Sequence, residues 1–118
     1  MNWVRCFIKP NSPKLKADFL ARRFAGQSLT LWGAGEIGVK LTRALVDRGL
    51  SVSRLIDLNP RKIGQRIHGA RVVMPDDLGA PGHEHLLSAV GAKGARAEIR
   101  AWLDSRGWVE GRHFTCVA

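Results

Sequence analysis

Residues 29–38 read Leu-Thr-Leu-Trp-Gly-Ala-Gly-Glu-Ile-Gly. The four residues before the first glycine form a short apolar run, which predicts a β-strand. Beyond the glycines, apolar residues recur at helical spacing at Ile37, Leu41 and Leu45, and Gly49 closes the run. This stretch therefore predicts a strand, a glycine-rich turn and a helix in direct succession.

The rest of the chain repeats this alternation of strand and helix. Four further strands are predicted, at residues 52–56, 71–74, 85–90 and 113–117. Apolar residues at helical spacing predict one more helix, over Ala95, Ile99, Trp102 and Leu103. Strands that alternate with helices imply a parallel sheet. Residues 28–118 are therefore predicted to form a Rossmann-like α/β domain of three layers, with about five parallel strands in the order 3-2-1-4-5.

Residues 1–27 are predicted to form a basic leader that contains one amphipathic helix. Ser12 is the expected N-cap and Pro13 the first residue of a helix that runs to about residue 25 and ends before Gly26. The apolar residues of this helix are Leu15, Phe19, Leu20 and Phe24. Burial of this apolar face against the sheet is favoured over the alternative, in which the cations of the helix lie on an anionic membrane surface.

The composition is that of one ordinary domain, with 118 residues of which 45% are hydrophobic and 25% charged. Nineteen lysines and arginines against ten acidic residues give a net charge of +9, which raises nucleic acid as a partner. However, residues 1–26 carry six of these cations against Asp18 alone. The four Phe and four Trp residues mostly fall at core-like positions, so no aromatic platform and no nucleic-acid binding are expected.

Cysteine usage and the lack of targeting signals indicate a cytoplasm-like compartment. Cys6 and Cys116 lie near opposite ends without metal-ligand or redox spacing, so both are expected to be reduced and buried. No apolar stretch approaches the ~20 residues that span a bilayer, and residues 1–10 lack the apolar core of a signal peptide. The domain is expected in the cytoplasm, with the inner face of the membrane as an alternative.

The glycine pattern Gly-x-Gly-x-x-Gly begins at Gly33, and Asp57 ends the next predicted strand 19 residues after Gly38. In a dinucleotide-binding turn the first glycine permits the bend, the second lets the backbone approach a pyrophosphate, and the third lets the helix pack closely on the strand. The acidic residue accepts hydrogen bonds from ribose hydroxyls and repels a 2′-phosphate. NAD is therefore favoured over NADP, although Arg61 and Lys62 weaken that preference.

Two observations leave an alternative to nucleotide binding open. Glu36 lies inside the glycine turn, where its carboxylate can cap the helix N-terminus and compete with a phosphate. The glycines can also serve packing alone, in a Rossmann-like unit without a ligand. The predicted nucleotide site comprises Gly33, Ala34, Gly35, Glu36, Ile37, Gly38, Asp57, Leu58, Arg61, Val90 and Gly91.

No catalytic residue is assigned. The chain contains no Tyr, which excludes the Tyr-x-x-x-Lys proton relay of short-chain dehydrogenases. The one local cluster that pairs a base with a carboxylate is His83-Glu84-His85. It has no third partner nearby in sequence, so it is interpreted as loop polarity. Lys93 and Arg96 follow the fourth predicted strand, and they are interpreted as solvated loop cations in preference to contacts for a phosphate or a sugar acid.

Four segments carry a resemblance to a known family: residues 31–38, residues 56–64, residues 89–91 with 94–96, and residues 110–114. Over residues 14–118 the chain resembles the small Rossmann-like domain at the C-terminal end of some bacterial family 2 glycosyltransferases, which has relatives in polysaccharide and sugar-modification proteins. The glycine turn and Asp57 alone are also similar to the nucleotide-sugar-binding domains of bacterial sugar acyltransferases and to the cofactor domain of nucleotide-sugar dehydratases.

The resemblance implies an accessory domain in a cell-surface glycan pathway, with NAD or a nucleotide sugar as its ligand. An Asp-x-Asp motif for a sugar-nucleotide diphosphate is absent, so glycosyl transfer by these residues is not expected. The expected function is a non-catalytic nucleotide-binding module beside a glycosyltransferase catalytic domain. The alternative is a ligand-free interaction module that forms a homodimer or docks on a glycosyltransferase partner.

Overall fold

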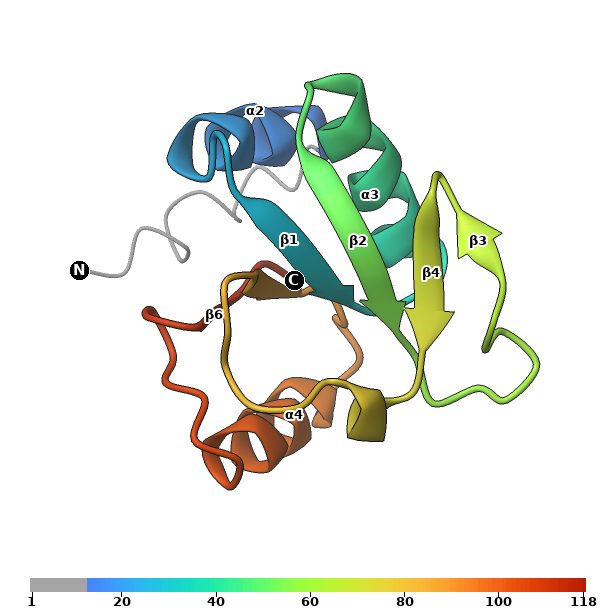
Figure 1. Ribbon diagram of the computed structural model, residues 1–118, viewed down its shortest axis with the longest axis vertical. Coiled ribbons are helices and arrows are strands. Elements are labelled where there is room, and N and C mark those ends of the chain that lie inside the picture. Colours follow the sequence, from blue (N-terminus) through green and yellow to red (C-terminus); the bar gives the residue numbers. More distant parts are fainter. Residues whose placement is uncertain (1–12) are drawn as a thin grey trace.

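A computed structural model describes residues 13–118, in which a six-stranded sheet carries helices on both faces (Figure 1). The helices are α2 (Pro13–Arg23), α3 (Glu36–Asp47) and α4 (Ala95–Asp104), with a short 3-10 turn, η1 (Pro75–Asp77). The strands are β1 (Ser28–Trp32), β2 (Ser51–Ile56), β3 (Arg66–Ile67), β4 (Ala70–Val73), β5 (His85–Ser88) and β6 (Phe114–Cys116). In Figure 1, α2 and α3 lie on one side of the sheet and α4 on the other, which confirms the predicted three-layer α/β class.

The strand order across the sheet is β3-β4-β2-β1-β5-β6. The last five strands of this order pair in parallel, and they follow the order predicted from the sequence. β3 is an addition at the edge that the sequence did not predict, and it pairs antiparallel with β4. His68 (φ 50°) and Gly69 (φ 86°) connect these two strands, and positive φ at both central positions is typical of a tight hairpin turn. The sheet therefore differs from the prediction by one short strand.

The sheet face toward α2 and α3 buries one apolar cluster, in which Leu29 and Leu31 of β1 are fully buried. From α2, Ala17 and Leu20 are also fully buried, which confirms that this helix packs against the domain. Leu15 is 56% exposed, so its predicted place on the buried face is wrong. The reason is geometric, because Leu15 lies five residues before Leu20 and so about 140° away around the helix.

Part of the predicted leader lies outside the described residues. Three predictions concern this part: the N-cap at Ser12, the buried thiol of Cys6 and the lack of a signal peptide in residues 1–10. Within the described residues, α2 begins at Pro13 as predicted and ends at Arg23, two residues earlier than predicted.

The opposite face of the sheet buries a second apolar cluster under α4. Ile99 and Leu103 of α4 belong to this cluster together with Trp32 of β1 and Ile56 of β2. Cys116 of β6 is a buried free thiol, as expected, and burial raises the pKa of this thiol. No helix within residues 13–118 is long and apolar enough to cross a membrane.

The connections between strands define the edge at which a ligand can approach. The crossover from β1 to β2 contains α3, whereas the crossover from β5 to β6 contains α4 on the other face. The strand order therefore reverses between β1 and β5, and ligands of doubly wound sheets bind beside the carboxyl ends of such strands. The connection from β2 to β4 contains turns and β3 in place of a helix.

Candidate functional site

Two glycines at the junction of β1 and α3 are required by the fold itself. Gly33 has φ 129°, and a Cβ atom there would lie 3.1 Å from Val90 Cγ2 and 3.2 Å from the carbonyl oxygen of Ala89. A Cβ atom at Gly38 would lie 1.9 Å from the carbonyl oxygen of Gly33. Gly33 therefore serves the bend and Gly38 serves the close approach of α3 to β1, as the motif predicts.

The middle glycine has no such structural cause. Gly35 is the N-cap residue of α3 with φ −80° and ψ −171°, which any residue can adopt. A Cβ atom at this position would meet no atom within 4 Å. The missing side chain therefore leaves open space in front of the first turn of α3, where no side chain caps the helix. This is the arrangement that lets a ligand approach the backbone closely.

Asp57 lies directly after β2, and its carboxylate holds the glycine turn. Oδ2 accepts a hydrogen bond from the N–H of Ala34 at 3.0 Å, and Oδ1 accepts one from the N–H of Asn59 at 2.8 Å. Lys62 Nζ donates to the carbonyl oxygen of Ala34 at 2.8 Å. The loop after β2 is thus fastened to the turn after β1. A carboxylate offers about four acceptor positions, so Asp57 retains capacity for a ligand's hydroxyl groups.

Glu36 points along the exposed side of α3 and does not cap it. Its carboxylate accepts a hydrogen bond from Lys40 Nζ at 2.9 Å, one helical turn further on, and the side chain is 79% exposed. This hydrogen bond lowers the pKa of Glu36. The expectation that Glu36 caps α3 is therefore wrong.

A cavity of about 310 Å³ opens at the carboxyl edge of the sheet, between the glycine turn and α4. Four of the predicted site residues line it: Gly33, Asp57, Leu58 and Val90. Its other lining residues are Trp32, Ile56, Pro75, Ala95, Glu98, Ile99 and Trp102. The walls are thus mostly apolar, with two carboxylates and two indole rings, a composition typical of small-molecule sites.

The remaining predicted residues do not line the cavity. Ala34, Gly35, Glu36, Ile37 and Gly38 follow Gly33 along the turn and the first turn of α3.

Two predicted residues lie in loops. Arg61 is exposed, and its N–H donates to Asn59 Oδ1. Gly91 lies next to Ile37, because a Cβ atom on Gly91 would be 3.7 Å from Ile37 Cδ1. The structure therefore brings the glycine turn, Asp57 and the loop after β5 to one edge.

The cavity wall from α4 is the part of the site that sequence reasoning missed. The sequence places Ile99 and Trp102 in a predicted helix and assigns no role to Glu98. All three residues line the cavity, and Ile99 and Trp102 are spaced for a common helical face. Trp102 meets the ring of Trp32 edge to face at 5.2 Å between centroids, and the Arg106 guanidinium stacks over Trp102 at 3.7 Å. These contacts fix the orientation of the indole in the cavity wall.

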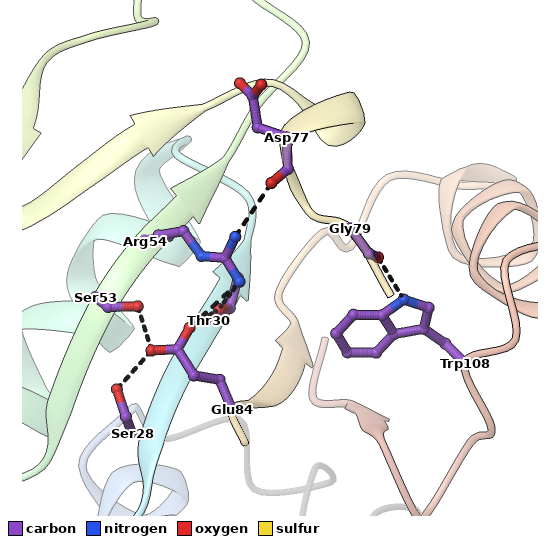
Figure 2. Close-up of polar contacts among 8 residues, drawn as sticks. All are labelled: Ser28, Thr30, Ser53, Arg54, Asp77, Gly79, Glu84 and Trp108. Atoms are coloured by element: carbon purple, nitrogen blue, oxygen red, sulfur yellow. Dashed lines mark hydrogen bonds and ion pairs between the residues drawn. The ribbon is translucent and has the colours of Figure 1, made fainter. Parts of the chain in front are cut away.

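Glu84 forms a polar cluster at the opposite edge, near the amino ends of the strands (Figure 2). Its carboxylate accepts hydrogen bonds from the hydroxyls of Ser28 at 2.7 Å, Thr30 at 2.7 Å and Ser53 at 2.5 Å. The Arg54 guanidinium lies 3.3 Å from it. Partial burial opposes ionisation, but the hydroxyls and the guanidinium lower the pKa of Glu84 below its ordinary value. The interpretation of Glu84 as loop polarity is therefore wrong.

The loop that leads to Glu84 is fastened at two further points. Arg54 Nη1 donates to the carbonyl oxygen of Asp77 at 3.3 Å, and the indole N–H of Trp108 donates to that of Gly79 at 3.2 Å (Figure 2). This cluster holds the sheet and the loop together, and it lies away from the cavity.

His85 is also structural. The residue is 7% exposed, and the centroid of its ring lies 4.5 Å from that of Phe24. Its Nε2 pairs with Thr115 Oγ1 at 2.8 Å. Burial, assisted by the charge of Arg23, lowers the pKa of His85 to about 4. The imidazole is therefore neutral in the folded protein at physiological pH.

This burial makes stability depend on pH. Between pH 6.5 and 4 the unfolded chain binds a proton at His85 that the folded chain excludes, so stability falls as the pH falls through this window. At pH 5 we expect a loss of about 2 kcal/mol relative to pH 7.5, measured by urea denaturation. His85→Gln, which cannot titrate, is expected to lose much less between the two pH values. An equal loss in both proteins would show that His85 is not the titrating group.

Within residues 13–118 no group of three or more His, Cys, Asp and Glu side chains is placed to hold a metal ion. The ionisable side chains that line the cavity are Asp57 and Glu98. No family model, no curated protein and no solved structure matches the chain, so its function is inferred from the residues of the site.

Proposed function

We propose that this domain binds a nucleotide, NAD or a nucleotide sugar, at the carboxyl edge of its sheet, and that it does so without catalysing a reaction. The observation that carries the proposal is the continuity of three features at this edge. The open backbone at Gly35, the carboxylate of Asp57 and the apolar cavity lie at one edge, and their chemistry suits the phosphate, ribose and base of a nucleotide.

Each part of the ligand has a partner of suitable chemistry. The phosphates lie at the N-terminus of α3, where backbone N–H groups have no side-chain cap and the helix dipole favours negative charge. The ribose hydroxyls donate to the free acceptor positions of Asp57. The base enters the cavity between apolar side chains and the indole rings of Trp32 and Trp102.

The cellular role is part of the same proposal and is supported by the sequence resemblance. The domain serves as an accessory module of a bacterial glycosyltransferase or glycan-assembly protein, on the cytoplasmic side of the membrane. Its partner is the catalytic domain of that protein. A binding role is supported by the cavity, because its walls are mostly apolar.

A second candidate function is a ligand-free interaction module. Three large apolar side chains at the same edge favour it: Leu58 is 72% exposed, Ile37 is 52% exposed and Met74 is 44% exposed. A homodimer or a glycosyltransferase partner would cover these side chains. Because both functions use one edge of the sheet, ligand titration and light scattering together distinguish them.

Calorimetric titration with NAD, NADH, UDP and a UDP-sugar tests the proposal. We expect saturable binding of at least one of them to the wild type. Gly35→Val fills the open space before α3 and is expected to abolish this binding, while the far-UV circular dichroism stays unchanged. Asp57→Asn keeps an acceptor for the N–H of Ala34 but removes the charge, and it is expected to weaken binding about tenfold.

One outcome would contradict the proposed site, and another would contradict nucleotide binding itself. Retained affinity in both variants would place the ligand elsewhere. No heat change with any of the four ligands, together with a concentration-dependent mass in light scattering, would favour the interaction module.

A further inference from the structure

The cavity contains one acidic side chain that the nucleotide scheme above does not use. Glu98 lines it from α4, and apart from Asp57 it is the one charged group in a wall that is otherwise apolar or glycine. Asp57 already accepts hydrogen bonds from the backbone of Ala34 and Asn59. Glu98 has no side-chain hydrogen bond or ion pair to any of residues 13–118.

This lack of a partner distinguishes Glu98 from the other glutamates. Glu36 pairs with Lys40, Glu84 with Arg54, and Glu110 with Arg100. The chain carries nine excess positive charges, so cations are plentiful.

Yet the sequence of α4 offers no cation to Glu98. The positions three and four residues away are Gly94, Ala95, Ala101 and Trp102, and these are the positions whose side chains meet on a helix. Glu98 is exposed, and its carboxylate is therefore free to interact with an occupant of the cavity that it lines.

The position of Glu98 relative to Asp57 decides what it meets. Asp57, directly after β2, and Glu98, on α4, line the same cavity. In the inferred pose the ribose is held at Asp57 and the base is directed toward α4. The edge that reaches Glu98 is then the one farthest from the glycosidic bond, which is the Watson–Crick edge. An ionised carboxylate accepts hydrogen bonds and donates none. It stabilises a base that presents an amino group there and disfavours one that presents a carbonyl oxygen.

We propose that Glu98 determines base specificity at this site, selecting a base with an exocyclic amine, as in adenine, cytosine or guanine, over uracil. Adenine and cytosine present an amine where uracil presents an oxygen, and guanine offers its N1–H and its 2-amino group side by side. Uracil offers a single N3–H between two carbonyl oxygens, which repel the carboxylate. The inference rests on the proposed nucleotide binding and narrows it: NAD is preferred to a UDP-sugar, and a nucleotide sugar bound here carries an amino-bearing base.

Nucleoside diphosphates provide a direct test, because ADP, GDP and UDP have the same phosphates and ribose. We expect calorimetry to give ADP and GDP about tenfold tighter binding than UDP, a factor typical of one hydrogen bond to a charged group at a partly exposed site. In Glu98→Gln the amide can also donate a hydrogen bond. UDP binding is therefore expected to strengthen and the ratio to fall to within about threefold. Glu110→Gln, which changes an exposed glutamate paired with Arg100, is the matched control and should keep the wild-type ratio.

The outcomes separate this inference from the proposed function. If the wild type binds all three nucleotides with equal affinity, or prefers UDP, or if Glu98→Gln keeps the wild-type ratio, Glu98 does not select the base and nucleotide binding stands. If the wild type binds none of the three and also fails to bind NAD, both the inference and the proposed function are wrong.

Discussion

Gly38→Ala is expected to destabilise the protein by at least about 3 kcal/mol. A Cβ atom at this position would lie 1.9 Å from the carbonyl oxygen of Gly33, and 2.7 Å from its carbonyl carbon. The obstructing atoms belong to the backbone, so no side chain can rotate away. The whole of α3 must therefore move off β1, which disrupts the apolar cluster that contains Leu41 and Leu45.

Gly35→Ala provides the matched control in the same turn. A Cβ atom there meets nothing within 4 Å, and φ is −80°, so the cost is expected to stay within about 1 kcal/mol, the usual cost of a poorer N-cap. Urea denaturation followed by circular dichroism measures both free energies of unfolding. Equal losses in the two variants would contradict the close approach of α3 to β1.

Glu84→Ala is expected to cost about 2 to 3 kcal/mol in the free energy of unfolding. The substitution leaves the hydroxyls of Ser28, Thr30 and Ser53 without their shared acceptor. It also leaves the half-buried guanidinium of Arg54 without a counter-charge. Each lost partner adds to the cost, although water reaches this edge and replaces part of the interaction.

The matched control is Glu36→Ala, which removes an equally charged side chain from an exposed pair with Lys40. We expect no measurable change there, because water hydrates both groups when the pair is broken. Chemical denaturation at pH 7.5 compares the two variants, since His85 is neutral in both states at that pH. A loss in Glu84→Ala no larger than that in Glu36→Ala would show that the cluster does not stabilise the fold.

The features that could be predicted are local in sequence. The bend at Gly33 and the contact at Gly38 follow from a strand, a turn and a helix within twenty residues. Asp57 could be placed at the same edge because it directly follows the next strand, and parallel strands end together. The order of the five parallel strands follows from the same alternation of strand and helix.

The features that could not be predicted depend on residues far apart in the chain. The partners of Glu84 lie 30 to 56 residues away in sequence. The sequence alone therefore does not show that the paired strands bring these partners to the carboxylate. Ile99 and Trp102 showed an apolar helical face, but not that this face would close a cavity over the end of β1. The sequence does not predict β3, because a strand of two residues is too short to give a hydrophobic pattern.

The central claim, that a nucleotide binds at the carboxyl edge of the sheet, is tested most directly by nuclear magnetic resonance of the ¹⁵N-labelled protein. NAD is titrated into one sample and a UDP-sugar into another, and the amide and indole N–H signals are followed. We predict saturable shifts for the amides of residues 33–35 and 57–58 and for the indoles of Trp32 and Trp102, with the signal of Glu84 unchanged. Shifts centred on Glu84, or none with either ligand, would contradict the claim.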